Sequence, residues 1–136
     1  MSFDPTSDYP LGSHRPDLVE TPSGLALDEV TLEAARAGTL VAGDIRATPA
    51  TLRRQAEVAR ATGRAQLADN LDRAAELAAV PDDQLLEIYT ALRPGRSTDA
   101  ELEEWAVRLD RWEAPLTATF VREAAAAYAA RGLTRD

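Results

Sequence analysis

The sequence has 136 residues, of which 15 are basic and 23 acidic, so its formal net charge at pH 7 is −8. This excess of acid argues against binding to nucleic acid or to an anionic membrane surface, because both attract clusters of Lys and Arg. The absence of cysteine excludes disulfides, thiolate metal ligands and a cysteine nucleophile, and no apolar run approaches the ~18 residues of a membrane span.

Residues 1–26 are predicted to form an irregular extended arm, because prolines and glycines recur too often there for a helix of useful length. Apolar side chains also punctuate this segment, among them Tyr9, Leu11 and Leu18, so it differs from a plain linker. We expect the arm from Asp8 onward to lie across another surface, with a disordered tail as the alternative. Residues before Asp8 are expected to be loose.

Helical signals begin after the arm. Thr31 is the expected N-cap of a short helix. The pair Thr48-Pro49 predicts the start of a longer helix that Gly63 ends, and residues 64–79 are expected to form the next one. Because the turn at Gly63 is short, these two helices should pack as an antiparallel pair.

The segment 80–98 holds the densest run of large apolar side chains and is expected at the centre of the core. Pro81 is the predicted first helical residue, since its missing N–H would have no partner there. Pro94-Gly95 ends this helix. Its predicted apolar face consists of Leu85, Leu86, Ile88, Tyr89 and Leu92.

Two further helices complete the prediction. Thr98 and Glu101 match a capping box and start a helix whose apolar positions include two tryptophans. Pro115 begins the last helix, and Gly132 ends it. The positions of that helix expected to face inward are Leu116, Phe120, Val121, Ala124 and Tyr128.

No stretch of any length alternates with the period of a strand, so the predicted fold class is all-α. The predicted organisation is a single domain over residues 1–136, in which residues 27–136 form a compact helical bundle behind the arm of residues 1–26. The helices are rich in alanine, which stabilises little on burial. We therefore expect an isolated chain of modest stability, as for a subunit that a partner stabilises.

The sequence offers little catalytic chemistry. His14, the single histidine, stands in a loop and is expected at the surface. The acidic side chains at 101, 103 and 104 are interpreted as solvated acids of a helix start, with acid–base catalysis as the alternative. Trp105 and Trp112 could stack on a flat cofactor, although packing in a core or interface is the preferred interpretation. No nucleophile, base and oxyanion donor assemble, so no catalytic, cofactor-binding or metal residue is predicted.

A partner surface is the remaining candidate site. Arg93 and Arg96 flank Pro94-Gly95 on a turn that is expected to be exposed. They are either simply solvated or anchored to the carboxylates of a partner, and the anchor is the preferred interpretation because guanidinium groups pair well with carboxylates. The candidate partner-interface residues are Tyr9, Leu11, Leu18, Arg93 and Arg96.

A series of short blocks runs in order through the chain, and the most continuous of them lie between residues 70 and 98. The blocks are Asp8-Tyr9-Pro10-Leu11, Arg15-Pro16, Thr21-Pro22-Ser23-Gly24, Leu27-Asp28, Thr31-Leu32-Glu33, Thr48-Pro49, Thr51-Leu52-Arg53, Gln55-Ala56, Asn70-Leu71, Arg73-Ala74-Ala75-Glu76-Leu77, Pro81-Asp82-Asp83, Leu86-Glu87-Ile88-Tyr89, Ala91-Leu92-Arg93-Pro94, Arg96-Ser97-Thr98, Phe120-Val121-Arg122-Glu123-Ala124-Ala125 and Tyr128. In these blocks the chain resembles the small subunit of the adenosylcobalamin-dependent diol and glycerol dehydratases.

The resemblance implies a small, non-catalytic structural subunit that is inactive alone. In that family a large barrel subunit holds the substrate and its metal ion, and adenosylcobalamin lies between the large and medium subunits, so this chain would bind no cofactor. The assembly is typically a dimer of heterotrimers. It is a lyase that converts a 1,2-diol, propane-1,2-diol or glycerol, to an aldehyde by radical dehydration. The alternative is a free-standing helical module for protein–protein interaction.

The resemblance also implies a cytoplasmic bacterial protein. Some relatives carry a longer N-terminal segment that is associated with packaging into a protein-shelled microcompartment. Only seven residues precede Asp8 in this sequence. We therefore expect this chain to lack that packaging signal.

Overall fold

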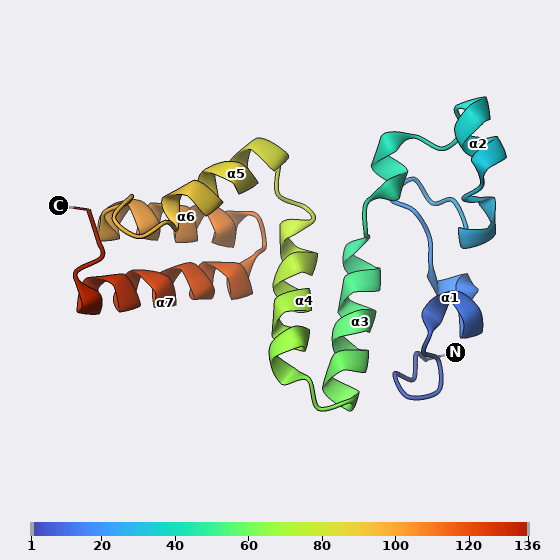
Figure 1. Ribbon diagram of the computed structural model, residues 1–136, viewed down its shortest axis with the longest axis horizontal. Coiled ribbons are helices and arrows are strands. Elements are labelled where there is room, and N and C mark those ends of the chain that lie inside the picture. Colours follow the sequence, from blue (N-terminus) through green and yellow to red (C-terminus); the bar gives the residue numbers. More distant parts are fainter. Residues whose placement is uncertain (1, 136) are drawn as a thin grey trace. The chain divides into compact units, whose positions relative to one another are not determined.

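The computed structural model describes residues 2–135, which form seven α-helices and three short 3-10 helices (Figure 1). Over this range the structure contains no strand, and it has one isolated bridge between Glu20 and Ala26. The predicted all-α fold class is confirmed. The chain divides between Ala78 and Ala79 into two compact units, which we call the N-terminal unit and the C-terminal unit. That residues 27–136 form a single bundle stays a prediction.

The arm at the start of the N-terminal unit contains only short turns of helix, which are α1 (Leu11–His14) and a 3-10 turn over Pro16–Leu18. Another 3-10 turn, over Leu27–Glu29, follows directly after it. The prediction that the prolines prevent a long helix is therefore confirmed. Within the segment before Asp8, which was expected to be loose, residues 5–7 form a turn in which the Asp8 backbone N–H donates a 2.9 Å hydrogen bond to the carbonyl of Asp4.

The next elements begin at the expected caps. In α2 (Leu32–Ala37) the hydroxyl of Thr31 accepts the N–H of Ala34, as predicted. A 3-10 turn over Ala42–Ile45 follows and leads toward the central hairpin of the N-terminal unit.

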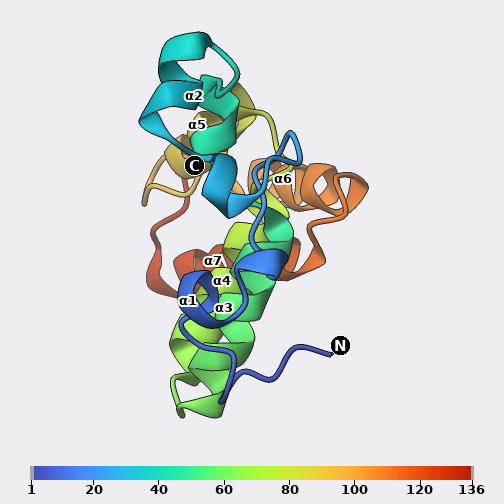
Figure 2. The same cartoon turned by 90° about the vertical axis from the view of Figure 1, so that its right-hand side faces the viewer.

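The central hairpin consists of α3 (Pro49–Ala61) and α4 (Ala65–Leu77), which pack along each other, side by side in Figure 1 and overlapping in the turned view of Figure 2. Thr48 caps α3 by accepting the N–H of Thr51. Gly63, with a positive φ of 76°, makes the tight turn, so the predicted antiparallel pair is confirmed. The core of this hairpin consists of Ala56, Ala59, Ala68 and the partly buried Leu71.

The C-terminal unit contains α5 (Asp82–Ala91), α6 (Asp99–Arg111) and α7 (Pro115–Arg131). Pro81 is the residue before α5 rather than its first residue, and the capping box at the start of α6 is formed as predicted. Helices α6 and α7 pack along each other (Figure 1). The largest fully buried side chains are Leu102, Leu109 and Val121.

The prediction for the apolar face of α5 is wrong in part. Ile88 is buried at 3% exposure, whereas Leu86 is 70% exposed and Tyr89 is 61% exposed. Successive helical residues are about 100° apart, so Leu85, Ile88 and Leu92 share one face and the other two residues share a neighbouring one. Only the first face is turned inward, and this segment is therefore not the centre of the core.

The prediction for α7 also fails at two positions. Leu116 and Phe120 are exposed, while Thr117, Ala118 and Val121 are the buried residues of this helix. Because alanine occupies most sides of α7, its sequence defines no strong apolar face. The contacts with α6 decide which side is buried, and they favour small side chains that let the two helices approach closely.

Candidate functional site

Three of the candidate catalytic side chains, His14, Glu101 and Glu103, make structural contacts. Nδ1 of the exposed His14 lies 3.1 Å from the carbonyl oxygen of Ser7. Over residues 2–135 the structure has no cluster of His, Cys, Asp or Glu that could hold a metal ion. None of the helices in that range is long and apolar enough to cross a membrane.

The acidic side chains at the start of α6 stabilise the C-terminal unit. Glu101 accepts the backbone N–H of Thr98 at 2.8 Å and pairs with Arg135. The Thr98 N–H is the main reason that the pKa of Glu101 is lowered. Glu103 accepts hydrogen bonds from Nε and Nη2 of Arg122, at 3.1 and 3.0 Å, and so links α6 to α7. Both glutamates therefore have structural roles, Glu101 in capping and ion pairing and Glu103 in an ion pair.

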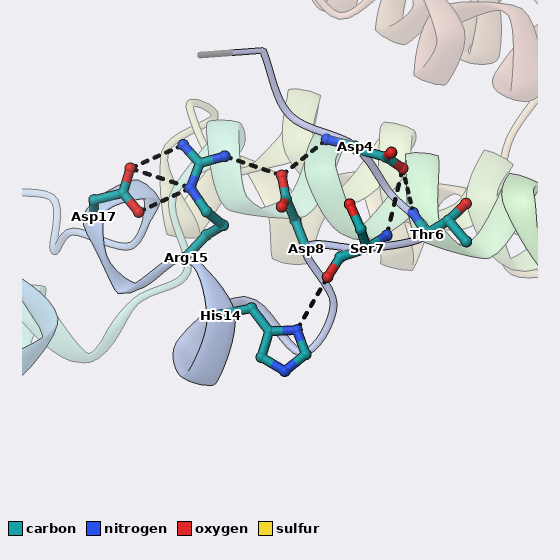
Figure 3. Close-up of polar contacts among 7 residues, drawn as sticks. All are labelled: Asp4, Thr6, Ser7, Asp8, His14, Arg15 and Asp17. Atoms are coloured by element: carbon teal, nitrogen blue, oxygen red, sulfur yellow. Dashed lines mark hydrogen bonds and ion pairs between the residues drawn. The ribbon is translucent and has the colours of Figure 1, made fainter.

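Arg15 holds the arm together through two carboxylates (Figure 3). Its Nη1 donates to Asp8 at 2.9 Å, and its Nε and Nη2 donate to Asp17 at 3.0 and 2.9 Å. The bidentate pair lowers the pKa of Asp17 and raises that of Arg15. The arm is thereby folded back on itself on either side of α1.

A second turn closes the start of the arm (Figure 3). Oδ1 of Asp4 accepts the backbone N–H groups of Thr6 and Ser7, at 2.8 and 3.4 Å. Oδ2 of Asp8 accepts the N–H of Asp4 at 2.9 Å. The Thr6 N–H is the largest cause that lowers the pKa of Asp4, because it stabilises the ionised carboxylate.

The arm is fastened to α3 within the N-terminal unit. Nη1 of Arg54 donates a 2.7 Å hydrogen bond to the carbonyl of Leu18. Leu11 is buried at 6% exposure, so it belongs to the core of its own unit. Tyr9 is 55% exposed and lines a hollow of about 370 Å³ over the α3–α4 hairpin, together with Val58. Of the three arm candidates, Tyr9 is thus the most accessible to a partner.

The segment after the arm carries apolar side chains that sequence reasoning missed. Ile45 is 80% exposed. It lines an apolar hollow of about 270 Å³ with Val19, Leu27 and Val30. No helical or strand periodicity marks these residues. Their only signal in the sequence is the presence of large apolar groups in an irregular segment.

Asp44 organises that segment from inside. Its buried carboxylate accepts the N–H of Val41 at 3.0 Å and the N–H of Ser23 at 3.3 Å. Hydrogen bonding by Ser23 is the largest cause that lowers the pKa of Asp44. The contact joins two loops that are 21 residues apart in the sequence.

The turn between α5 and α6 carries the two remaining candidates, Arg93 and Arg96, and both side chains are exposed. The end of the chain holds this turn. The N–H of Gly95 donates to the carbonyl of Leu133 at 2.7 Å, and the N–H of Arg135 donates to the carbonyl of Ser97 at 2.9 Å. The turn is therefore tied at two points to the segment that follows α7.

Two side-chain hydroxyls fix the same turn from inside the C-terminal unit. Tyr128 Oη donates to the carbonyl of Leu92 at 2.6 Å, and the buried Ser97 Oγ donates to the carbonyl of Ala91 at 2.9 Å. Both acceptors lie at the end of α5, where the last carbonyls of a helix lack partners within it.

A hollow of about 500 Å³ lies beside this turn and is lined by residues of α5, α6 and the turn itself. Leu86, Arg96, Trp105 and Arg108 are among its walls. The guanidinium of Arg108 stacks over the ring of Trp105, 4.7 Å from its centroid. Sequence reasoning assigned Leu86 to the core, so this hollow was not predicted.

Comparison with known proteins identifies the family. The sequence profile of the dehydratase small subunit family matches residues 5–135. The chain is 52% identical over 126 residues to the propanediol dehydratase small subunits of Citrobacter freundii and of Salmonella typhimurium. Each match covers 92% of this chain and 73% of the relative. This chain therefore belongs to the dehydratase small subunit family.

Proposed function

We propose that this chain is the small structural subunit of a diol dehydratase, a lyase that converts a 1,2-diol to an aldehyde. The observation that carries the proposal is the 52% identity over 92% of the chain to two propanediol dehydratase small subunits. Their names favour propane-1,2-diol over glycerol as the substrate of the complete enzyme. The free-standing interaction module is the less supported alternative.

The proposal assigns the chemistry to other subunits. Adenosylcobalamin supplies the radical in such an enzyme. We place the substrate in the large subunit and the cofactor between the large and medium subunits. The complete enzyme is proposed to be a dimer of heterotrimers in the bacterial cytoplasm. The structural contacts of His14, Glu101 and Glu103 are consistent with a chain that contributes stability rather than catalysis.

The arm is proposed as one part of the contact with the other subunits. Tyr9 and Leu18 would face the partner, whereas Leu11 would support them from the core of the N-terminal unit. The variant Tyr9→Ala removes an exposed side chain and leaves the bonds of Arg15 in place. We expect it to lower the yield of complex, and an unchanged yield would contradict this role of the arm.

Co-expression tests the proposed function. The chain is produced together with large and medium subunits of a diol dehydratase, and the mixture is separated by size-exclusion chromatography. We expect the three chains to elute together and to form aldehyde from propane-1,2-diol when adenosylcobalamin is added. A chain that elutes alone while the other two form an active enzyme would support the interaction module instead.

A further inference from the structure

The exposed side of α5 and the turn after it form a second surface whose composition differs from that of the chain as a whole. Leu86 and Tyr89 are three residues apart, so they lie on one side of the helix, and both are largely exposed. Arg93 and Arg96 follow at the turn. We call these four residues the α5 surface.

The α5 surface combines positive charge with exposed apolar side chains. The chain has a net charge of −8, yet Arg93 and Arg96 form no ion pair among residues 2–135. Arg15, Arg60 and Arg122 each pair with two carboxylates, whereas Arg53 of α3 is also exposed and without an ion pair in the same range. What distinguishes Arg93 and Arg96 is that they follow the exposed Leu86 and Tyr89 along the chain. Two unpaired guanidinium groups in an acidic chain are suited to carboxylates that another molecule brings.

The turn is also held in place before any partner arrives. Four hydrogen bonds fix it, from Tyr128 and Ser97 to the end of α5 and between the turn and the segment 133–135. A surface that is already ordered loses less conformational entropy on binding. Those bonds involve the backbone of the turn, so both guanidinium groups stay available.

The neighbouring hollow adds an apolar contact. Leu86 and Trp105 line it, while Arg96 and Arg108 contribute positive charge. Glu87 and Glu104 line the same hollow, so a uniformly acidic partner would be repelled there. The matching partner surface therefore has an apolar side chain for the hollow and carboxylates only where it meets the turn. Tyr and Arg are the residue types that dominate binding energy at such contacts.

We propose that the α5 surface docks onto another subunit of the dehydratase, through an apolar side chain flanked by Asp or Glu of that subunit. This inference rests on the proposed function and deepens it, because it names the part of the chain that binds and the chemistry of the partner. It extends the predicted role of Arg93 and Arg96 to the apolar side of α5.

Binding measurements on charge variants test the ionic part of the contact. Arg96→Glu and Arg93→Glu are compared with the wild type and with the control Arg53→Glu, in which an exposed, unpaired arginine of α3 undergoes the same charge change. The dissociation constant toward the assembled large and medium subunits is measured at two salt concentrations. We expect each turn variant to bind about tenfold more weakly and with a smaller salt dependence, and Arg53→Glu to bind like the wild type. Arg96→Lys keeps the positive charge and should bind at an intermediate strength.

Apolar variants test the other half of the contact. Leu86→Gln and Tyr89→Gln replace exposed side chains by one that favours helix, and Val107→Gln is the matched control on α6 away from the hollow. Circular dichroism and the melting temperature of each free chain verify that it is folded. We expect the two α5 variants to bind at least tenfold more weakly than the wild type. The control variant should bind like the wild type. Equal affinities for all variants would overturn the inference.

The same series separates this inference from the proposed function. If the wild-type chain fails to join the large and medium subunits, the proposed function is wrong and the inference with it. If the wild type joins them and the α5 variants join equally well, only the inference is wrong. If the variants change self-association of the free chain and leave complex formation intact, the α5 surface binds a second copy, which also overturns it.

Discussion

The hydroxyl of Tyr128 donates a 2.6 Å hydrogen bond to the carbonyl of Leu92, which lies 36 residues earlier at the end of α5. The bond gives a partner to a helix-terminal carbonyl that has none within its own helix. It also connects α7 to the turn that carries Arg93 and Arg96. A side chain of the last helix thus helps to hold this candidate interface in position.

The variant Tyr128→Phe tests that connection. Removing the hydroxyl leaves the Leu92 carbonyl without its donor, so we expect a loss of about 0.5–1.5 kcal/mol in the free energy of unfolding. Tyr89→Phe is the matched control, because the Tyr89 side chain is mostly exposed and should change stability little. Urea denaturation of both variants measures the difference. Equal midpoints would show that the hydrogen bond contributes nothing measurable.

The core of the C-terminal unit is tested by a pair of leucines. Leu102 is fully buried, so Leu102→Ala should cost about 2–5 kcal/mol of stability through lost burial and the cavity left behind. Leu86→Ala should lie within about 0.5 kcal/mol of the wild type, because that side chain is exposed. Thermal and urea denaturation report both values. A larger loss of stability for Leu86→Ala than for Leu102→Ala would mean that the Leu86 side of α5 faces the core, which would contradict the structure.

The arm makes a prediction about local order. Arg15→Ala removes the donor that joins Asp8 to Asp17, so the amide hydrogens of residues 4–18 should exchange faster. Residues 82–131 should keep their exchange rates. Hydrogen exchange followed by mass spectrometry measures both regions. Unchanged exchange in the arm would mean that other contacts, such as the one from Arg54 to Leu18, suffice to hold it.

Stability should fall in acid because several carboxylates have lowered pKa values in the folded chain, including Asp44 and Glu101. A lowered folded pKa means that the unfolded chain binds the proton more tightly. The stabilisation is therefore complete above the unfolded pKa, about 4, and is lost as the pH falls through the folded pKa.

The variant Glu101→Gln isolates one of these groups. Glutamine can still accept the Thr98 N–H of the capping box but carries no charge for Arg135. We expect the variant to be less stable than the wild type at pH 7 and to approach it as the pH falls below 4. Melting temperatures of both proteins between pH 3 and pH 7 provide the comparison. A gap that widens in acid would contradict the assigned cause.

Local sequence signals predicted the helix limits well. Thr31, Thr48 and Thr98 each accept an N–H three residues later, and this contact depends only on neighbouring residues. Gly63 and Gly132 end their segments with positive φ, which glycine adopts without strain. Caps and stops of this kind are visible in a sequence because both partners lie within one turn.

The buried faces were harder to predict. On α5 two apolar stripes compete, and only packing against other helices decides that Ile88 rather than Leu86 is buried. On α7 the many alanines leave the choice of face to the contacts with α6. The link between Asp44 and Ser23 joins loops that share no periodic pattern, so the sequence contains no sign of it.

In the candidate interface, too, features set by neighbouring residues could be predicted, whereas those set by packing between distant segments could not. The exposure of Arg93 and Arg96 could be predicted from the turn signal Pro94-Gly95, because a turn places its neighbours at the surface. The burial of Leu11 could not be predicted from the sequence, because it depends on how the arm folds onto its own unit. Leu86 and Tyr89 were predicted to be core residues and became the apolar part of the proposed docking surface instead.

The central claim is that this chain completes a dehydratase whose reactive centre lies in other subunits. The most direct measurement is a titration in which the purified chain is added to a fixed amount of the large and medium subunits, with adenosylcobalamin and propane-1,2-diol present. We expect aldehyde formation to rise and to saturate at one copy of this chain per large subunit, while the chain alone forms none. Activity that is independent of the added chain, or turnover by the chain alone, would contradict it.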